Sequence, residues 1–432
     1  MSVKRFMTYV FFVLLTIPAS VSFAQAIDFA DYFEDAILRI DYFHTANATC
    51  DEIAVDQIYM NDGWAGNPRK LLPLMENGRY TIKVIDIASN TLIYRRDYLD
   101  IVFEYKGTDE AKAEHKRTYH QTALIPCPKQ RILFSIQRRD THHMLQSVFS
   151  RIIDPNDRCI KREPASDMDR SFAIVKNGHP HDCVDLVFVA EGYQRAEFDK
   201  FNKDSQRFVN YLFTLKPFAS MKERFNIHGV FRASAQSGVD YPAERVYKNT
   251  VVDASYDTFG SGAYVTVFDN KSMRDIAGKV PYDHLIVLVN SEKYGGSGFY
   301  NSYTLFTSDN KRSEEIFTHE FGHGFAGLAD EYIAESYFDV YYTRGVEPLE
   351  PNITAYLNPN HVKWAHLLTA GAPLPTPAEE EYNKTVGLFE AAGYTQTGMY
   401  RSCLHCVMGA GGLPFCKACQ DAIEKVVEHY SN

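Results

Sequence analysis

The sequence predicts two folded parts, an all-β sandwich followed by a mixed α/β domain. Before residue 160, several segments alternate apolar and polar residues and are separated by turn residues, which is typical of short strands in a β-sandwich. A polar stretch with two prolines, residues 154–170, then interrupts this pattern. After it, continuous apolar runs alternate with segments of helical spacing, which indicates a mixed α/β domain.

Individual segments support both parts. In the first part, "GRYTIKVIDIAS", "NTLIYRRDYLDIVFEY" and "QRILFSIQRRD" have the alternation and the β-branched and aromatic content of strands. In the second part, "CVDLVFVAEGY", "FNIHGVFRAS" and "DHLIVLVNS" are predicted as strands, and "RAEFDKFNKDSQRFVNYLFTL" as a helix. We expect an accessory domain over residues 25–160 and a second domain over residues 161–432.

The N-terminus has the order of a secretory signal peptide. Lys4 and Arg5 precede an apolar run, and small residues follow at Ser22, Ala24 and Ala26. The alternative is a membrane anchor, but the apolar run is short and is interrupted by polar residues and a proline. We therefore expect residues 1–24 to be removed and the mature protein to be periplasmic, on the cell surface or extracellular.

Composition and charge argue against two classes of partner. The chain has 432 residues, with 45 Lys and Arg against 55 Asp and Glu, which gives a net charge of -10. Nucleic acids and anionic membranes both require a basic patch, and the sequence has no long run of basic residues. No stretch after the N-terminal segment is apolar enough to be expected to cross a membrane.

The stretch "EEIFTHEFGHGFAGLADEYI" carries the clearest chemical motif. His319 and His323 are four residues apart, so one helix face presents both imidazoles to a single metal ion. Glu320 follows the first histidine and is placed to take a proton from an attacking water molecule. The alternative is a purely structural helix. Gly322 and Gly324 argue against it, because each costs a helix up to about 1 kcal/mol and indicates that something approaches the backbone closely.

The third metal ligand is expected after a helix break. Gly327 can end the helix with a positive φ angle and return the chain toward the two histidines. Asp330 follows three residues later and is the favoured ligand, with Glu331 as the nearest rival and a distant carboxylate or histidine also open. If the helix continued, Asp330 would lie roughly 10 Å along the axis from His323, which is out of reach.

The motif, its spacing and a later methionine resemble the metzincin metallopeptidases. Within that group, "HEFGHGFAGLADEY", "VDLVFVAEGY", "YGGSG" and "PFCKACQDAI" are most similar to the IgA-peptidase family of secreted bacterial zinc metallopeptidases. The first part of the chain resembles the β module that precedes the peptidase in Bacteroidetes relatives. Two positions depart from the metzincin pattern: one extra residue precedes Gly327, and Ala329 stands where a histidine is expected.

The resemblance implies a metzincin-like fold and a secreted zinc endopeptidase acting on proteins or peptides. One catalytic Zn²⁺ would be held by His319, His323 and Asp330, with Glu320 as general base and Met408 as the methionine below the metal. It also implies that substrate lies along an edge strand formed by the segment after "YGGSGFY". The alternative function is a non-catalytic surface protein that binds a glycan or a protein through its β module.

Four cysteines near the C-terminus form two C-x-x-C pairs, Cys403 with Cys406 and Cys416 with Cys419. This spacing is compatible with a structural zinc site. Thiols of exported proteins tend to oxidise, so the predicted signal peptide favours disulfides instead. The sequence leaves both interpretations open, with disulfides preferred.

Overall fold

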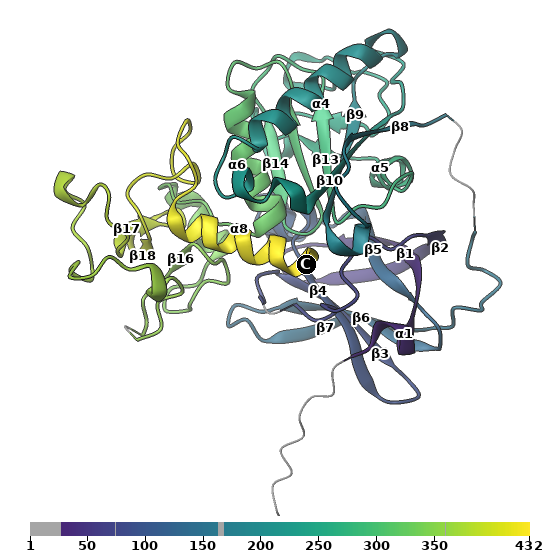
Figure 1. Cartoon of the computed structure of the whole chain (residues 1–432), viewed down its shortest axis with the longest axis horizontal. Coiled ribbons are helices and arrows are strands. Elements are labelled where there is room, and N and C mark those ends of the chain that lie inside the picture. The colour runs from purple at the N-terminus through teal and green to yellow at the C-terminus, as the bar shows by residue number, and fades with distance from the viewer. Residues whose placement is uncertain (1–26, 74, 163–167, 359) are drawn as a thin grey trace, which may run out of the picture.

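The structure is a computed structural model that describes residues 27–73, 75–162, 168–358 and 360–432 (Figure 1). The predicted signal peptide, residues 1–24, lies outside the described residues. Among the residues that are described, no helix is both long enough and apolar enough to cross a membrane.

The N-terminal part is β-rich and contains two antiparallel sheets. One sheet has the strand order β2-β1-β5 and the other β4-β3-β6-β7. Buried residues of both sheets, such as Tyr42, Tyr80 and Phe134, belong to one hydrophobic cluster. The strands are β1 (Phe33–Ala46), β2 (Asp51–Asp62), β3 (Tyr80–Asp86), β4 (Thr91–Tyr98), β5 (Arg117–Pro128), β6 (Ile132–Arg139) and β7 (Leu145–Ile153).

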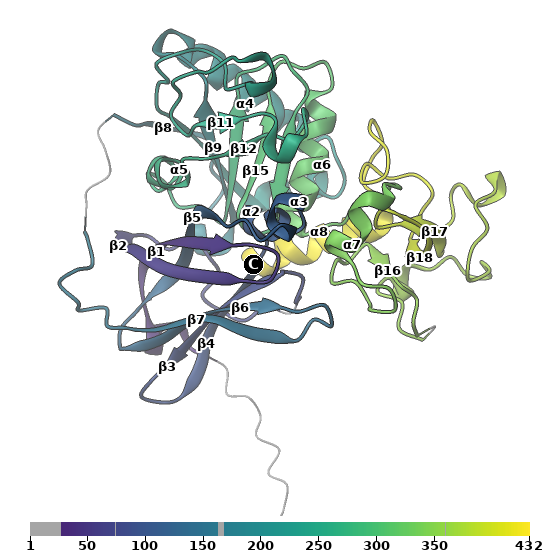
Figure 2. The same ribbon diagram turned by 180° about the vertical axis from the view of Figure 1, so that it is seen from behind.

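One predicted strand is partly helical. The segment "NTLIYRRDYLDIVFEY" forms β4 and then the helix α2 (Ile101–Lys106), which is followed by α3 (Asp109–Lys112). The prediction was wrong after Tyr98 because Asp100 acts as a helix N-cap. Its carboxylate accepts hydrogen bonds from the backbone N–H groups of Val102 and Phe103, at 3.1 and 3.3 Å. Figure 2 shows α2 and α3 between the N-terminal sheets and the rest of the molecule.

The second part is built on a six-stranded mixed sheet, so the predicted mixed α/β class is confirmed. The strand order is β14-β15-β13-β9-β10-β8; the four inner strands are parallel and the two outer strands antiparallel to their neighbours. The strands are β8 (Arg170–Val175), β9 (Val184–Glu191), β10 (Phe225–Phe231), β13 (His284–Val289), β14 (Gly296–Phe299) and β15 (Tyr303–Thr307).

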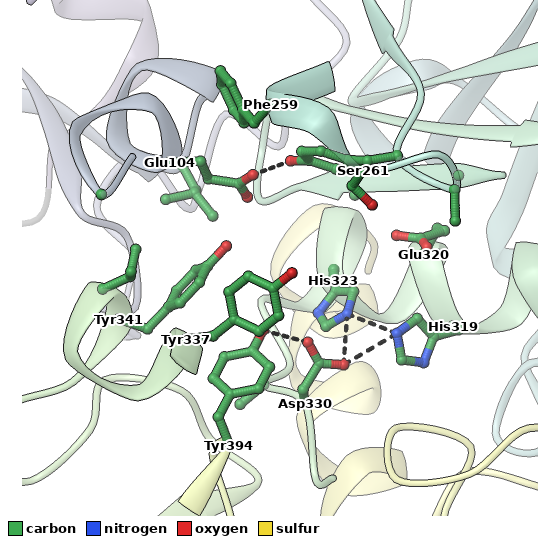
Figure 3. A pocket seen from close by; sticks show the side chains of 18 of the residues that line it. Glu104, Phe259, Ser261, His319, Glu320, His323, Asp330, Tyr337, Tyr341 and Tyr394 are labelled. Carbon is green, nitrogen blue, oxygen red and sulfur yellow. Dashed lines mark hydrogen bonds and ion pairs between the residues drawn. The ribbon is translucent and has the colours of Figure 1, made fainter. Parts of the chain in front are cut away.

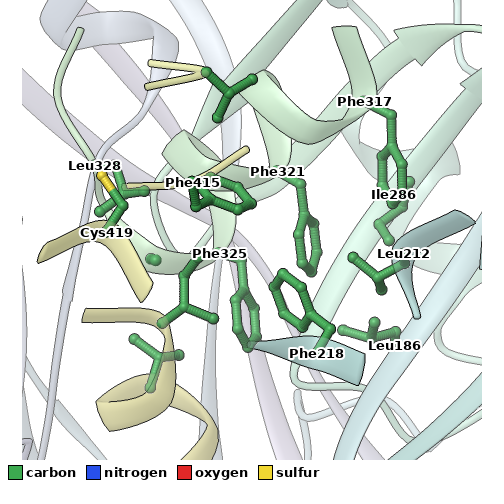
Figure 4. Close-up of a cluster of buried hydrophobic side chains, with 14 of the residues drawn as sticks. Leu186, Leu212, Phe218, Ile286, Phe317, Phe321, Phe325, Leu328, Phe415 and Cys419 are labelled. Carbon is green, nitrogen blue, oxygen red and sulfur yellow. The ribbon is translucent and has the colours of Figure 1, made fainter. Parts of the chain in front are cut away.

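Helices cover both faces of this sheet, which explains the continuous apolar run of β9. Leu186 and Phe188 belong to a cluster with the helices α4, α6 and α8, whereas Val187 and Val189 pack with α5 on the opposite face. Figure 4 shows aromatic side chains of α6 stacked within the first cluster. The helices are α4 (Phe198–Leu212), α5 (Asn270–Ala277), α6 (Ser313–Ala326) and α8 (Lys417–Tyr430).

The region between α6 and α8 contains a small sheet and irregular segments, visible as a separate lobe in Figure 1. The sheet has the order β16-β18-β17 and pairs antiparallel throughout. The elements here are α7 (Phe338–Tyr341), β16 (Ile353–Thr354), β17 (Phe389–Ala392) and β18 (Thr395–Arg401). The shortest elements elsewhere are α1 (Phe29–Tyr32), β11 (Ala254–Ser255) and β12 (Thr266–Val267).

The N-terminal sheets contact both later regions. Arg39 forms an ion pair of 2.6 Å with Asp275 of α5, and Arg79 forms one of 2.9 Å with Glu350. The backbone N–H of Leu99 donates a hydrogen bond of 2.9 Å to the Tyr300 carbonyl. These contacts place α2 beside β14 and α6, at one wall of a cleft.

Candidate active site

A cleft of about 1130 Å³ lies where the N-terminal part, α6 and the C-terminal lobe meet. The motif residues His319, Glu320, His323 and Asp330 line it, and Glu104 of α2 lines the opposite wall (Figure 3). Three regions that are far apart in the sequence thus surround the residues that the motif singled out.

The helix α6 ends where the sequence predicts a break. Its last residue is Ala326, and Gly327 has φ 60° and ψ 36°, in the left-handed region that glycine adopts without strain. The backbone N–H groups of Gly327 and Leu328 donate hydrogen bonds to the carbonyls of His323 and Gly322, at 3.0 and 3.2 Å, and the first of these is the bond of an αL cap. This reversal returns the chain to the histidine face of the helix.

The reversal brings Asp330 against both histidines. The Nε2 atoms of His319 and His323 are 3.0 Å apart, and Oδ1 of Asp330 lies 3.1 and 3.3 Å from them. Ligand atoms about 2 Å from a tetrahedral zinc ion are separated by about 3.3 Å. The three atoms therefore have the spacing of a zinc ligand set, and Figure 3 shows them converging on one point.

Hydrogen bonds orient both imidazole rings. Nδ1 of His319 donates to the Val407 carbonyl at 3.1 Å, and Nδ1 of His323 donates to the Leu328 carbonyl at 2.6 Å. With these protons on Nδ1, both Nε2 atoms present lone pairs toward Asp330. Oδ1 of Asp330 is buried and accepts no hydrogen bond from the described residues. Three inward acceptors without a donor fit a bound cation.

The Asp330 carboxylate and the two histidines stabilise one another's charged forms when no metal is bound. Burial lowers the pKa of His319, but the Asp330 carboxylate outweighs it and raises the pKa to about 9, so a cation that binds at Nε2 has to displace a proton. Burial raises the pKa of Asp330, but the two histidines hold it well below its usual range. Burial also raises the pKa of Glu320, only partly opposed by the histidines. Asp330 is thus kept as an anion, while Glu320 is a more basic carboxylate.

Comparison with known proteins identifies the chain. The family model described as IgA peptidase M64 matches residues 172–384 and 378–427, and the model described as the peptidase M64 N-terminus matches residues 28–150. The chain belongs to the IgA peptidase M64 family. The resemblance seen in the sequence is confirmed, and the protein is a peptidase whose substrates are proteins or peptides. No curated protein matches the chain.

In this M64 peptidase, the edge strand of the six-stranded sheet lies directly on α6. A Cβ atom on Gly296 would lie 3.1 Å from Oε1 of Glu320, and one on Gly298 would lie 2.8 Å from Cβ of His323. Only glycine fits this approach. The edge strand is β14, within "YGGSGFY" itself; the following segment, β15, is an inner strand, so its predicted position was wrong by a few residues.

Met408 lies beneath the same helix. Its side chain is fully buried, and its sulfur would be 2.8 Å from a Cβ atom on Gly322. A Cβ atom on Gly324 would lie 3.1 Å from the ring of His284. Both helix glycines therefore have a close neighbour, as the sequence indicates. The Met408 carbonyl accepts a hydrogen bond of 2.7 Å from the backbone N–H of Glu331.

The structure separates Asp330 from its rival Glu331. Oε1 of Glu331 lies 3.6 Å from Sγ of Cys419, on the side away from the histidines, and accepts a hydrogen bond of 2.9 Å from Asn352. The disulfide prediction was wrong, since all eight cysteines are free thiols. The thiols of Cys406, Cys416 and Cys419 surround this glutamate and do not form disulfides. The Sγ atoms of Cys416 and Cys419, for example, are 3.4 Å apart.

Glu104 and Tyr394 line the cleft, and the sequence predicted neither of them there. Glu104 comes from the N-terminal part of the chain. Its carboxylate accepts a hydrogen bond from the Tyr264 hydroxyl, and burial raises its pKa to about 7. The segment that carries it was predicted as a strand far from any chemistry. The only local signal is Asp100 as an N-cap, which predicts the helix α2 but not its position beside the motif helix.

Proposed function

We propose that this M64 peptidase is a secreted zinc-dependent endopeptidase. The observation that carries the proposal is the convergence of the two Nε2 atoms and Oδ1 of Asp330, 3.0 to 3.3 Å apart, beside Glu320 in a cleft. A second histidine-carboxylate group of this kind is absent from the described residues.

Zinc fits this group because its donors are two neutral imidazoles and one carboxylate, a common ligand set for catalytic zinc. Bound there, zinc would supply Lewis-acid chemistry, making a water molecule more acidic and polarising the scissile carbonyl. A set of three protein ligands is typical of a catalytic zinc site, whereas a closed structural site has four.

The residues of this chain have two further roles, holding the ion and transferring the proton. His319, His323 and Asp330 hold the ion, and their partners Val407 and Leu328 hold the rings in place. Glu320 accepts the proton of the attacking water and delivers it to the leaving amine. Its position favours this role, because Glu320 lines the cleft beside the three ligand residues.

The edge strand β14 provides the surface for a peptide backbone. It is the outermost strand of the sheet, and Gly296 and Gly298 line the cleft beside Glu320. The backbone N–H and carbonyl of Gly296 already pair with Ala263 and Val265, so an extended peptide would pair with this edge beside Gly298, next to the proton acceptor. This arrangement favours an endopeptidase, since an edge strand accepts residues on both sides of the bond that is cut.

We extend the proposal to fold, domains and location. The histidine helix below an edge strand, the turn at Gly327 and the buried Met408 support a metzincin-like peptidase domain over residues 161–432. Residues 25–160 are proposed as an accessory β-sandwich domain that also supplies a wall of the cleft through Glu104. Residues 1–24 are proposed as the export signal.

The second candidate is a non-catalytic protein that binds a glycan or a protein through its N-terminal sheets. The cleft between those sheets and α6 is compatible with it. The presence of Glu320 beside the ligand group favours catalysis, because a binding protein has no use for a proton acceptor at that position.

Two variants test the proposal. In Asp330→Ala, zinc measured by elemental analysis should fall by one ion per chain relative to wild type, with the fold checked by circular dichroism. In Glu320→Gln, zinc should be retained while hydrolysis of a proteome-derived peptide library falls about 10²- to 10⁴-fold. Unchanged zinc in the first variant would assign the third ligand elsewhere. A wild type that cleaves no peptide when loaded with zinc would favour the binding protein.

A further inference from the structure

We propose that Cys406, Cys416, Cys419 and Glu331 form a second metal site, which holds a structural zinc ion. Three sulfur atoms and one carboxylate oxygen, all within 4.8 Å of one another, meet between α8 and the segment after Asp330. This inference is independent of the proposed catalytic function, because it rests on a different group of residues.

The separations within the group are those of a tetrahedral site. Sγ of Cys419 lies 3.6 Å from Sγ of Cys406 and 3.4 Å from Sγ of Cys416. Oε1 of Glu331 lies 3.6 Å from Sγ of Cys419 and 4.0 Å from Sγ of Cys416. Zinc–sulfur bonds of about 2.3 Å predict ligand separations of about 3.7 Å, whereas a disulfide requires about 2.05 Å.

The local backbone stabilises the thiolate form of these cysteines. Cys416 is the N-cap of α8 and Cys419 lies in its first turn, so both thiols lie at the positive end of the helix dipole. The backbone N–H of Cys416 also donates a hydrogen bond of 3.4 Å to Sγ of Cys406. Both features stabilise thiolates, which are the form of cysteine that binds metal.

Burial supports the same conclusion. Cys419 and Glu331 have no exposed surface, and Cys406 and Cys416 are 2% and 6% exposed. Oε2 of Glu331 has no hydrogen-bond partner among the described residues. A buried carboxylate with an unsatisfied oxygen is costly unless a cation neutralises it. Figure 4 shows Cys419 beside Leu328, at the margin of the hydrophobic cluster.

The ligand set distinguishes zinc from other ions. Three thiolates and one carboxylate are too soft a set for calcium or magnesium, and a closed four-ligand site is typical of structural zinc. Cys403 lies at the margin of the group: its thiol is partly exposed and interacts with the Cys416 thiol, but it is not among the ligand atoms that all lie within 4.8 Å of one another. Glu331 therefore takes the position that Cys403 would fill in a site made of two C-x-x-C pairs. The hydrogen bond from Asn352 orients its carboxylate.

The site links two segments that support the catalytic group. Glu331 directly follows Asp330, and its backbone N–H binds the Met408 carbonyl. The neighbouring Val407 carbonyl accepts the hydrogen bond from His319. A zinc ion that joins Glu331 to Cys406 and Cys416, which flank the loop of Val407 and Met408, would fix this loop relative to Asp330. It would thereby fix the Val407 carbonyl that orients His319.

The first test is metal content of the purified full chain, measured as zinc, iron and copper per chain. We expect two zinc ions in wild type, one in Cys419→Ser and two in Cys159→Ser, the same change at an exposed cysteine outside the group. Asp330→Ala should retain the thiolate-bound ion, which separates this site from the catalytic one. Equal zinc in wild type and Cys419→Ser would overturn the proposal, as would iron or copper in place of zinc.

Two measurements on wild type keep the test sound if Cys419→Ser does not fold. Cobalt exchanged for zinc should give thiolate-to-metal charge-transfer absorption, which the histidine and aspartate group cannot produce; its absence would overturn the proposal. Denaturation with a chelator but no reductant should release eight reactive thiols. A lower count, with the mass loss of a disulfide within the C-terminal group, would show that these cysteines pair with one another instead.

Discussion

The Tyr394 hydroxyl donates a hydrogen bond to Oδ2 of Asp330, the carboxylate whose Oδ1 faces the two helix histidines. Tyr394 is 7% exposed and lies in the turn between β17 and β18, about sixty residues after its partner in the chain. The bond fixes the carboxylate rotation, so that one oxygen is committed to the tyrosine and the other to the ligand group.

Removing this hydroxyl should weaken the metal site without unfolding it. Tyr394→Phe keeps the ring but removes its hydrogen bond to Asp330, and loss of such a supporting contact lowers metal affinity about 10- to 100-fold. Competition with a chelator measures the zinc Kd. Tyr337→Phe is the control, since Tyr337 lines the same cleft and is half exposed. An unchanged Kd in Tyr394→Phe would show that the bond does not support the site.

The close approach of β14 to α6 predicts a steric effect at Gly298. A Cβ atom there would lie 2.8 Å from Cβ of His323 and 3.0 Å from the backbone nitrogen of Gly324. Gly298→Ala should therefore push the strand off the helix and lower the free energy of unfolding by about 1 to 3 kcal/mol. In Gly262→Ala the nearest atom is 3.7 Å away, so denaturant unfolding of that variant should match wild type.

The N-terminal part should affect substrate binding through Glu104. We expect Glu104→Ala to raise KM several-fold, with a smaller change in kcat and unchanged zinc content, because the residue lines the cleft without touching the ligand group. Steady-state kinetics on a peptide selected from a library measures this. Glu244→Ala, an exposed glutamate outside the cleft, is the matched control. Equal KM values would remove the N-terminal part from substrate recognition.

Stability should fall as pH rises, because of the buried pair Asp185 and Asp283. Burial raises the pKa of Asp185, with a further rise from the Asp283 charge, and burial likewise raises the pKa of Asp283. The folded protein therefore holds protons that the unfolded chain releases above about pH 4. Unfolding releases protons in this window, so the free energy of unfolding decreases up to about pH 8.

Asp283→Asn removes one of the two carboxyl groups that bind these protons. It keeps an oxygen that can accept the hydrogen bond of 2.8 Å from the Asp185 backbone N–H. The variant should lose less stability than wild type between pH 5 and pH 8, by about 1 to 3 kcal/mol. Denaturant unfolding at each pH measures the difference. Asp62→Asn, at an exposed position, should follow wild type; a parallel pH profile for Asp283→Asn would contradict the pKa shifts.

Local patterns in the sequence predicted the elements that carry the motif. The spacing of His319 and His323 predicts one helix face, and Gly327 predicts the break after it, because helix periodicity and a positive φ angle are properties of a few neighbouring residues. The buried strand β9 was likewise predicted from its apolar run. The helix α2 was missed, because alternating apolar residues outweighed a single capping residue.

Tertiary structure alone decided which side chains meet. Asp330 and Glu331 are adjacent carboxylates, and only packing turns one toward the histidines and the other toward the cysteines. The same holds for Glu104, which reaches the cleft from more than two hundred residues before the motif. The sequence by itself determined the helix, its break and the peptidase family. Which residues join the histidine and the cysteine groups depended on contacts between segments that are distant in the chain. No pattern among neighbouring residues predicts such contacts.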